Sequence, residues 1–592
     1  MKKILAFILA FAMVFSLAAC GGSSGGSAAQ PEAAPAQAES AAAQAESAPA
    51  KAESTAAASE KAEAEPAKPA EVEVVEAVEE VAQSVIPCAT GEIIRYETPT
   101  TGLKKEDPST LYVGEMVVVE NTNPGFSNST ACIDLMYDSL VRIDYDTGEY
   151  VGNVMESWEI ADDAQSMTFT VAPNVTFHDG TTATAEDLIY SLWRLAQPEL
   201  SPQADVSTFS NIDFDQSEAT GELTGKLVFK TPMLTIIPSM LKSWILSKEH
   251  IEGLGEDNAW WENSIGTGPY KIESIKQGDR YNLVRNDDYW KADEKAAFEK
   301  AVVRYYAEAS TMYMDFESGA LDLIINPLTT DVARVLNGDI NDAVCDIYPS
   351  LQTFCLGFNE EMNPVLADEN VRKAIYYALD VDIVTKLAYD FLGVGADSIF
   401  ANGVQDTYVR PHEQNIELAM QALSDAGYGP GELTLVFGTN TQNVNMALAE
   451  AVQAQIQEVG INVEIVTADP NEHISNFRNT GSQTYDFASS LVTYATLDCA
   501  PFLSNCVKSC NAMSFTAPTD DYVDELGLKI RGAQSLEEKA EATLALQEYI
   551  YDHYWMVPIV KTKTALIYKS YISGVRALTP RCPDLSEVYI VE

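Results

Sequence analysis

A strand–helix–strand run in the second half of the chain constrains the fold more than any other feature. Alternating apolar residues predict a strand at Leu433–Phe437, an apolar stripe predicts a helix at Met446–Val459, and a second strand follows at Ile461–Ile465. Gly460 marks the end of the helix. Two consecutive strands joined through a helix pair in parallel, because the helix carries the chain back to the starting edge. The chain is therefore expected to be an α/β protein.

Other segments show the same mixture of strands and helices. Strands are predicted at Val117–Val119 and Met167–Val171, and Asp144–Gly148 predicts a turn between two strands. Helices are predicted at four further places: Ile133–Leu140, after the cap Thr184 with Asp187 three residues on, after the cap Asp368, and at Ile416–Leu423 before the stop Gly427.

The first 19 residues have the pattern of a secretory signal. Lys2 and Lys3 form a basic start, and the apolar run that ends at Ala19 is shorter than the about 20 residues of a spanning helix. The sequence Leu-Ala-Ala before Cys20 resembles a bacterial lipobox, which implies cleavage before Cys20 and a diacylglycerol on its sulfur. The alternative is an ordinary signal peptide with Cys20 as a bystander. We expect an exported protein, lipid-anchored at the outer face of the cell membrane, with no later membrane span.

The segment after the signal, residues 20–107, is expected to be a lipidated Cys followed by a disordered acidic linker. Ala, Glu, Ser, Gln, Pro and Gly dominate up to about Pro69, and the unit Ala-Gln-Ala-Glu-Ser occurs at 36–40 and at 43–47. Such a segment has too few large apolar groups to form a core. Residues Glu71–Val85 alternate Val and Glu, which fits a short helix or strand, and are assigned to the linker.

The net charge of −51 excludes some classes of partner. Between Gly21 and Ile86 there are twelve Glu and three Lys, and with Lys2 and Lys3 set aside, residues 87–592 carry −44. Nucleic acids and anionic lipids require basic surfaces, so neither is expected as a partner. The charge fits a solvated acidic surface and is compatible with cationic ligands.

The cysteines permit disulfides without requiring them. If Cys20 is lipidated, eight of the nine remain: Cys88, Cys132, Cys345, Cys355, Cys499, Cys506, Cys510 and Cys582. An even number in an exported chain permits bridges, and unpaired thiols or one local bridge are the alternatives. Cys499, Cys506 and Cys510 lie close together in the sequence but have no nearby His, so a zinc site is not favoured.

No sequence motif indicates catalysis. The five His residues include no pair at helical metal-binding spacing, and neither a Gly-x-Ser-x-Gly elbow nor a phosphate-binding loop occurs. We therefore expect no enzyme, no cofactor and no metal centre.

Six short motifs occur in one order along about 300 residues. They are Glu156-Ser-Trp-Glu159 with Asp162-Asp163; Phe177-His-Asp-Gly180 with Thr184-Ala-Glu-Asp187; Gly266-Thr-Gly-Pro-Tyr270 with Arg285-Asn286 and Tyr289-Trp290; Gly319-Ala-Leu-Asp322; Phe358-Asn359 with Val371-Arg-Lys-Ala374 and Ala378-Leu-Asp380; and Ala426-Gly-Tyr428. Together they resemble the bacterial extracellular solute-binding proteins of family 5, the oligopeptide, dipeptide and nickel class that serves ABC importers. The resemblance covers about residues 108–590.

The resemblance implies a two-lobed periplasmic-binding-protein-like α/β fold with hinge strands and an extra subdomain in the first lobe. Lobe I is expected at 108–350, with the extra subdomain at about 150–262, lobe II at 351–559, and a C-terminal return to lobe I at 560–592. Phe354–Asn359 would lie at the first crossing between the lobes. The ligand would bind in the cleft, and hinge closure would bury it.

The resemblance also suggests ligand-binding residues. Family peptide binders often meet the peptide amino terminus with an Asp that follows an aromatic residue. Tyr494 occupies the aromatic position here and Asp498 is the nearby carboxylate, displaced by one residue, so a solvated loop Asp is the alternative. The loop Phe126, Ser127, Asn128 and Ser129 corresponds to a segment lining the cleft, and Phe358 and Asn359 lie at the crossing. Cys355 and Cys499 both fall near the expected cleft, where they would be able to form a disulfide.

The function implied is capture of short peptides for an ABC importer, whose permease and ATPase subunits are the partners. Three alternatives remain open. The same fold would serve a metal chelate, sugar or other organic solute; the protein would present its ligand to a membrane receptor as a sensor; or the chain would be an exported enzyme.

Overall fold

The computed structural model describes residues 81–88, 90–117, 121–126, 130–144, 147–202, 204, 206–478, 484–494, 497–510, 517–576 and 583–591. All of them belong to one compact unit, Ala77–Glu592. The predictions for the signal, for Cys20 and for most of the acidic linker lie outside the described residues.

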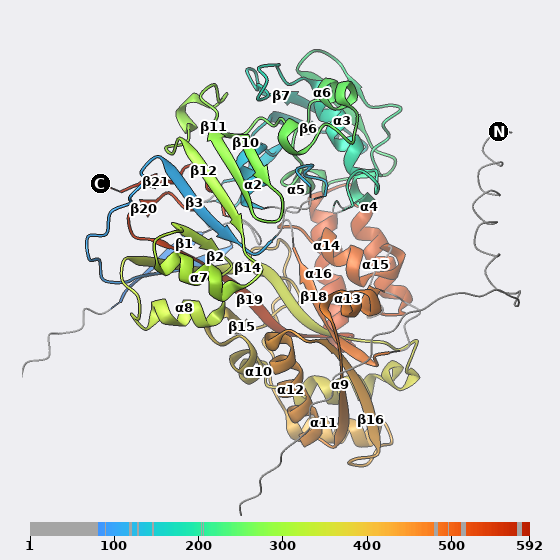
Figure 1. The fold of residues 1–592 in the computed structure, drawn as a ribbon. Coiled ribbons are helices and arrows are strands. Elements are labelled where there is room, and N and C mark those ends of the chain that lie inside the picture. The colour runs from blue at the N-terminus through green and yellow to red at the C-terminus, as the bar shows by residue number, and fades with distance from the viewer. Residues whose placement is uncertain are drawn as a thin grey trace, which may run out of the picture. The chain divides into compact units, whose positions relative to one another are not determined.

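A single mixed sheet passes through the fold (Figure 1). Its strands lie in the order β10 (Tyr270–Lys276), β11 (Arg280–Arg285), β12 (Lys300–Tyr305), β3 (Thr110–Glu115), β13 (Leu323–Ile325), β19 (Met556–Lys569), β14 (Ala343–Phe358), β18 (Phe487–Thr493), β16 (Leu433–Asn440) and β17 (Ile461–Ala468). Three more strands join its sides: β1 (Ala82–Cys88), β2 (Gly91–Glu97) and β15 (Gly393–Gly395).

Two long strands, β14 and β19, connect the two lobes. Residues Ala343–Pro349 of β14 pair with β19 in lobe I, and Thr353–Gly357 pair with it in lobe II. The register breaks between Pro349 and Thr353, and Leu351 within the break has a φ of 52°. Almost every residue of β14 is buried, as expected for a strand covered on both faces. Strand β14 therefore runs without a break from one lobe to the other, but its hydrogen bonding to β19 is interrupted between the lobes.

Lobe I carries the other, smaller sheets. A four-stranded sheet, in the order β6 (Met155–Ile160), β7 (Ser166–Val171), β9 (Thr224–Val228) and β8 (Glu218–Ala219), has its own hydrophobic core and forms the extra subdomain. Two strand pairs complete the list: β4 (Val141–Ile143) with β5 (Tyr150–Gly152), and β20 (Ile572–Ser573) with β21 (Tyr589–Ile590).

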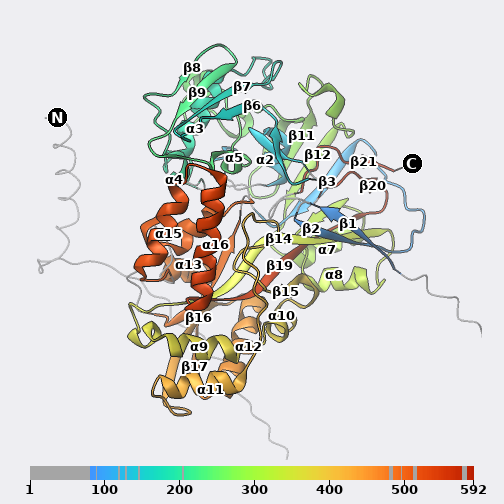
Figure 2. The same cartoon turned by 180° about the vertical axis from the view of Figure 1, so that it is seen from behind.

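The helices divide between the two lobes (Figures 1 and 2). Those before the crossing are α2 (Ala131–Met136), α3 (Ala185–Leu195), α4 (Val206–Phe209), α5 (Ile236–Met240), α6 (Lys248–Leu254), α7 (Ala309–Glu317) and α8 (Thr329–Leu336). Those after it are α9 (Glu369–Ala378), α10 (Val381–Ala388), α11 (Ile416–Asp425), α12 (Asn443–Glu458), α13 (Pro470–Arg478), α14 (Ala500–Cys506), α15 (Asp521–Arg531) and α16 (Leu536–Asp552).

The strand–helix–strand prediction is confirmed in lobe II. Strands β16 and β17 pair in parallel from Leu433–Ile461 to Asn440–Ala468, and α12 lies between them in the chain. Gly460 has a φ of 96°, a left-handed conformation that glycine adopts without a steric penalty. Two predicted caps are also present: the Thr184 hydroxyl accepts from the Asp187 N–H in a reciprocal capping box, and the Asp368 carboxylate caps α9.

Three local predictions differ from the structure. Val117 lies outside strand β3, which ends at Glu115, and α2 ends at Met136 instead of Leu140. The expected disordered linker is wrong over its last part, because β1 and β2 form a hairpin and β2 pairs with Val344–Ile347 of β14. The Arg95 guanidinium fixes this hairpin through hydrogen bonds of 2.8 and 2.9 Å to the buried Asp346 carboxylate.

Two of the motifs contact each other through one side chain. His178 accepts from the Gly266 N–H at 3.1 Å through Nδ1, and its Nε2 lies 3.1 Å from the Gly268 carbonyl oxygen. The second motif is thus held against the third, and burial lowers the pKa of His178 to about 4. No described helix has the length and apolar character needed to cross a membrane.

Candidate functional site

The two lobes touch where the β4–β5 hairpin of lobe I meets the segment after β18 in lobe II. The Leu497 N–H donates to the Tyr150 hydroxyl at 3.1 Å. Ile143, at the end of β4, packs against the hydrophobic core of lobe II. Burial raises the pKa of Tyr150 well above its usual range, so its hydroxyl stays neutral at this contact. These contacts define the lobe seam.

A cavity of about 380 Å³ opens along the same boundary, and we call it the interlobe cavity. On the lobe I side it is lined by Thr208, Ser210 and Asn211 around the end of α4, and by residues 230–235 before α5. On the lobe II side it is lined by Ala500, Leu503 and Ser504 of α14 and by Ile530 and Arg531 of α15. Its volume lies within the range of about 300–1,000 Å³ found for small-molecule pockets. The view from behind places α4 above α15 and α16, across this boundary (Figure 2).

The predicted ligand residue Asp498 lies beside the lobe seam and already has a cationic partner. Its Oδ2 accepts from the Lys539 ammonium of α16, and its Oδ1 accepts from the Ala500 N–H at 2.8 Å. Asp498 is 2% exposed and Lys539 is 3% exposed. Burial by itself lowers the pKa of Lys539, but the Asp498 charge more than offsets this and the net pKa is raised. The pair is therefore buried and charged.

Three other predicted ligand residues lie inside lobe II. Tyr494 is fully buried and packs against the Phe400 ring at 5.6 Å, and Phe358 packs against Phe487 at 6.4 Å. Asn359 uses its amide to tie the end of β14 to the segment before β18: its Nδ2 donates to the Tyr485 carbonyl at 3.2 Å, and its N–H donates to the Asp486 carbonyl at 2.8 Å. Their contact with a solute stays a prediction.

The early loop is described in part. Phe126 is half-buried and its N–H donates to the Asn123 carbonyl at 3.0 Å. Ser127, Asn128 and Ser129 lie outside the described residues. Their role in lining the cleft stays a prediction.

The suggested disulfide between Cys355 and Cys499 is wrong. Both are free thiols, as are the other five described cysteines. The Cys499 Sγ lies 3.8 Å from the Thr543 hydroxyl, and burial raises the pKa of Cys499 to about 12. In the described part of the chain, no group of His, Cys, Asp and Glu side chains is arranged to hold a metal ion.

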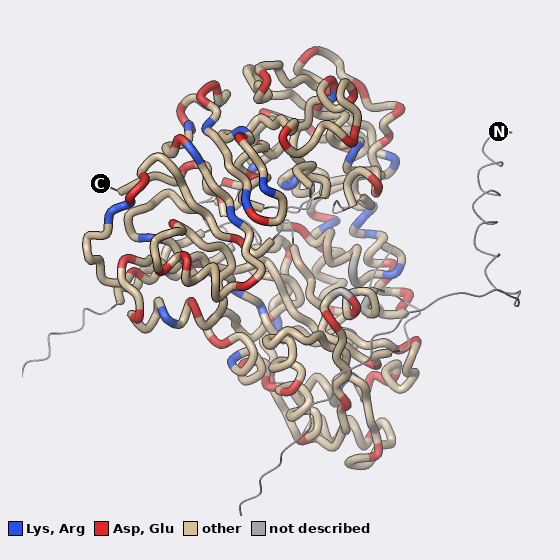
Figure 3. Tube along the Cα trace, viewed as in Figure 1, with Lys and Arg blue, Asp and Glu red and all other residues tan. Residues whose placement is uncertain are grey.

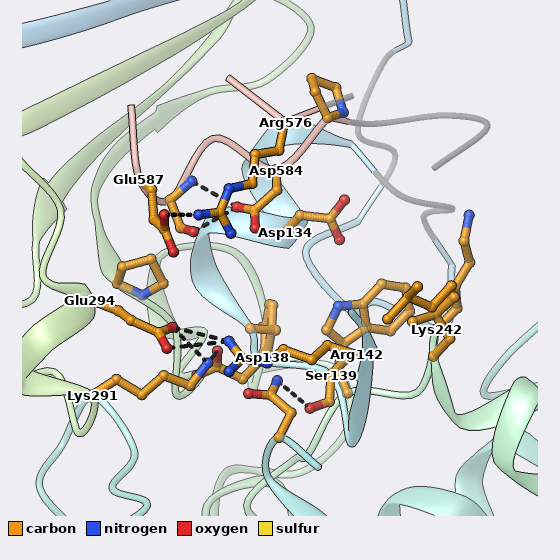
Figure 4. A pocket seen from close by; sticks show the side chains of 18 of the residues that line it. Asp134, Asp138, Ser139, Arg142, Lys242, Lys291, Glu294, Arg576, Asp584 and Glu587 are labelled. Atoms are coloured by element: carbon orange, nitrogen blue, oxygen red, sulfur yellow. Dashed lines mark hydrogen bonds and ion pairs between the residues drawn. The ribbon is translucent and has the colours of Figure 1, made fainter. Parts of the chain in front are cut away.

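A second cavity, of about 170 Å³, lies within lobe I between α2, β4 and the C-terminal segment (Figure 4). Its charges compensate one another. Arg142 lies 3.2 Å from Glu294, Lys291 lies 3.4 Å from the same carboxylate and 3.5 Å from Asp138, and Arg576 pairs with Glu587. Because these side chains neutralise one another, the lining of this cavity does not indicate the charge of a ligand.

Sequence reasoning missed Tyr150 at the lobe seam, Lys539 beside it, and the two cationic residues that line the interlobe cavity. Lys539 lies between Glu537, Glu538 and Glu541, a pattern typical of a solvated helix face, and only the tertiary structure brings it to Asp498. Tyr150 follows the predicted turn Asp144–Gly148, and no sequence pattern indicated that its side chain would contact the other lobe. Lys230 and Arg531 belong to no motif and line the same cavity only because the extra subdomain packs against lobe II.

Comparison with known proteins agrees with this geometry. The sequence profile described as bacterial extracellular solute-binding proteins, family 5 Middle, matches residues 149–514. The dipeptide-binding protein of Escherichia coli K12 is 25% identical over 396 residues, which cover 62% of this chain and 73% of that protein.

Two solved structures show the same fold. The ABC transporter substrate-binding protein CtaP of Listeria monocytogenes has a TM-score of 0.73 at 22% identity, with 82% of this chain and 100% of that chain covered. NikZ of Campylobacter jejuni, in complex with Ni(L-His), has a TM-score of 0.67 at 18% identity, with 82% and 100% covered. Because the family profile matches more than half of the residues and spans both sides of the lobe seam, this chain belongs to the family 5 bacterial extracellular solute-binding proteins and is a solute-binding protein, not an enzyme.

Proposed function

We propose that this protein is the lipid-anchored binding component of an ABC importer, and that it captures short peptides between its lobes and delivers them to the permease. The observation that carries the proposal is the family match over residues 149–514, which includes the extra subdomain, the crossing strand β14 and the segment after β18. The dipeptide-binding relative and the ABC transporter assignment of CtaP support the ligand class and the partner.

The seam supports a mechanism of capture by closure. The Tyr150–Leu497 hydrogen bond joins the lobes directly, while β14 and β19 join them through a register break that leaves three residues of β14 without ladder pairing to β19. Bending at the break would separate Tyr150 from Leu497 and open the interlobe cavity. Closure around a solute excludes water and strengthens the polar contacts to it.

A second candidate solute is a non-peptide molecule. Lys539 already supplies the positive charge that a peptide amino terminus would bring to Asp498. A peptide amine would be a second cation at Asp498, and it would meet a carboxylate whose Oδ1 and Oδ2 each already accept a hydrogen bond. This favours a ligand that is not held by its amine, such as the nickel chelate bound by NikZ.

Native mass spectrometry of the purified protein, followed by denaturation and identification of the released molecules, tests the proposal. A mixture of short peptides is the expected result. A single non-peptide mass would replace the peptide with the second candidate while leaving solute binding intact. If the protein is empty, a thermal-shift screen follows, because a ligand at 100 times its Kd adds about 2.7 kcal/mol to the free energy of unfolding; no shift with any peptide would refute the peptide proposal.

A further inference from the structure

The interlobe cavity differs from the rest of this protein in its charge. Acidic side chains exceed basic ones by 51 over the whole chain, and they occur throughout the described trace (Figure 3). The lining of the interlobe cavity nevertheless includes Lys230 and Arg531 and no Asp or Glu among the described residues. The lobe I cavity shows the contrast, since five carboxylates and four cationic side chains line it.

Lys230 and Arg531 are not neutralised by the surrounding structure. The Lys230 ammonium donates to the Ser210 carbonyl at 2.7 Å, and the Arg531 Nη2 donates to the Cys510 carbonyl at 2.8 Å. Both acceptors are uncharged, and neither cation forms an ion pair within the described ranges. An ammonium has three donors and a guanidinium has five, so most of their hydrogen-bonding capacity remains for a ligand.

The two cations come from opposite lobes. Lys230 follows β9 in the extra subdomain, and Arg531 ends α15 in lobe II. Two like charges that face one cavity oppose closure of the seam, and an anion between them removes that repulsion. Thr235 and Ser504 also line the cavity, and their hydroxyl groups are suited to donate to oxyanions, whereas the Thr231 hydroxyl already donates to the Asn211 Oδ1 at 3.0 Å.

We infer that the interlobe cavity binds an anionic group, a carboxylate or phosphate, with Lys230 and Arg531 as its cationic contacts on the two lobes. Where that group belongs to the captured solute, the inference rests on the proposed function and assigns an acidic solute. A free inorganic anion offers the same chemistry and would act as a co-ligand that favours the closed arrangement.

Isothermal titration of the purified protein with three probes tests the inference: a tripeptide with a free carboxyl end, the same tripeptide as its C-terminal amide, and inorganic phosphate. The variants are Lys230→Gln and Arg531→Gln. Lys226→Gln and Lys529→Gln are matched controls, because each removes an equal charge from β9 or α15 at an exposed residue outside the cavity lining. All titrations use one buffer at physiological ionic strength, where the Debye length is about 8 Å.

We expect Lys230→Gln and Arg531→Gln each to lower the affinity for an anionic probe at least tenfold, as loss of a charge-assisted hydrogen bond does. The affinities of the control variants should stay within twofold of the wild-type value. A preference for the acid over the amide assigns the anionic group to the solute, and binding of phosphate alone assigns it to a free anion. Equal losses in the cavity variants and controls, or probes that bind without regard to charge, would overturn the inference. If no peptide binds but phosphate binds in a Lys230-dependent way, the anion site stands and the peptide proposal fails.

Discussion

The buried pair between Asp498 and Lys539 allows a quantitative test of how lobe II is held together beside the seam. Replacing Asp498 with Asn keeps the size of the side chain and its acceptor for the Ala500 N–H, but removes the only described carboxylate that bonds Lys539. Because Lys539 is 3% exposed, its charge is then left uncompensated in the interior. Removing one partner of such a pair costs about 3–5 kcal/mol of unfolding free energy.

The pH dependence of this loss has a definite sign. In the wild-type protein the folded-state pKa of Lys539 is raised, so the contribution of the pair is present below the unfolded pKa of about 10.4 and is lost as pH rises through the folded value. In Asp498→Asn, the Asp498 charge no longer offsets burial, which is the largest influence on Lys539 and lowers its pKa, so the unfolded chain binds more protons and stability rises with pH. The difference between the two proteins is therefore expected to shrink from pH 7 to pH 10.

Urea unfolding followed by tryptophan fluorescence measures this difference at several pH values. Glu361→Gln is a matched control, because it breaks the exposed pair with Lys508 and is expected to cost less than about 1 kcal/mol. The double variant Asp498→Asn/Lys539→Met removes both charges and is expected to recover much of the loss. A loss below about 1 kcal/mol for Asp498→Asn, or a difference that does not change with pH, would refute the reasoning.

Four further predictions follow from other contacts. Tyr150→Phe removes the hydrogen bond across the lobe seam and should weaken solute binding about five- to tenfold with little change in Tm, as read by titration; unchanged affinity would remove this contact from closure. Thr184→Ala should cost about 1 kcal/mol in urea unfolding through loss of the α3 capping box, whereas a neutral result would show that packing alone holds the helix. His178→Gln should flatten the fall in stability between pH 6.5 and 4, because the folded protein keeps His178 neutral while the unfolded chain protonates it; an unchanged profile would contradict that burial. Cys20→Ser should release the protein from the membrane into the medium, and unchanged fractionation would defeat the lipid anchor.

The sequence was most informative where local pattern and packing agree. The parallel pair β16–β17 and the caps Thr184 and Asp368 follow from periodicity and capping chemistry, which depend on residues only a few positions apart. The β1–β2 hairpin was missed, since its strands are largely exposed and its stability comes from pairing with β14 about 250 residues away.

The candidate site was less predictable for the same reason. Asp498 was identified by resemblance, but its partner Lys539 lies 41 residues further on, in a helix whose acidic neighbours suggested solvent. Tyr494 was expected to face a ligand; it is fully buried in lobe II, and its contact with a solute stays a prediction, because an aromatic residue after a strand fits either position. The contacts of Asp498 and Tyr494 depend on residues that are distant in the sequence and become neighbours only in the folded protein.

The β1–β2 hairpin also decides which lobe bears a mechanical load. It pairs with Val344–Ile347, the part of β14 that precedes the register break, so the chain enters the folded region through lobe I. Any tether attached upstream therefore acts on lobe I and transmits no force across the crossing strands. If the chain is anchored upstream of this hairpin, lobe II carries none of the load from the anchor, and its approach to lobe I does not depend on the length of the tether.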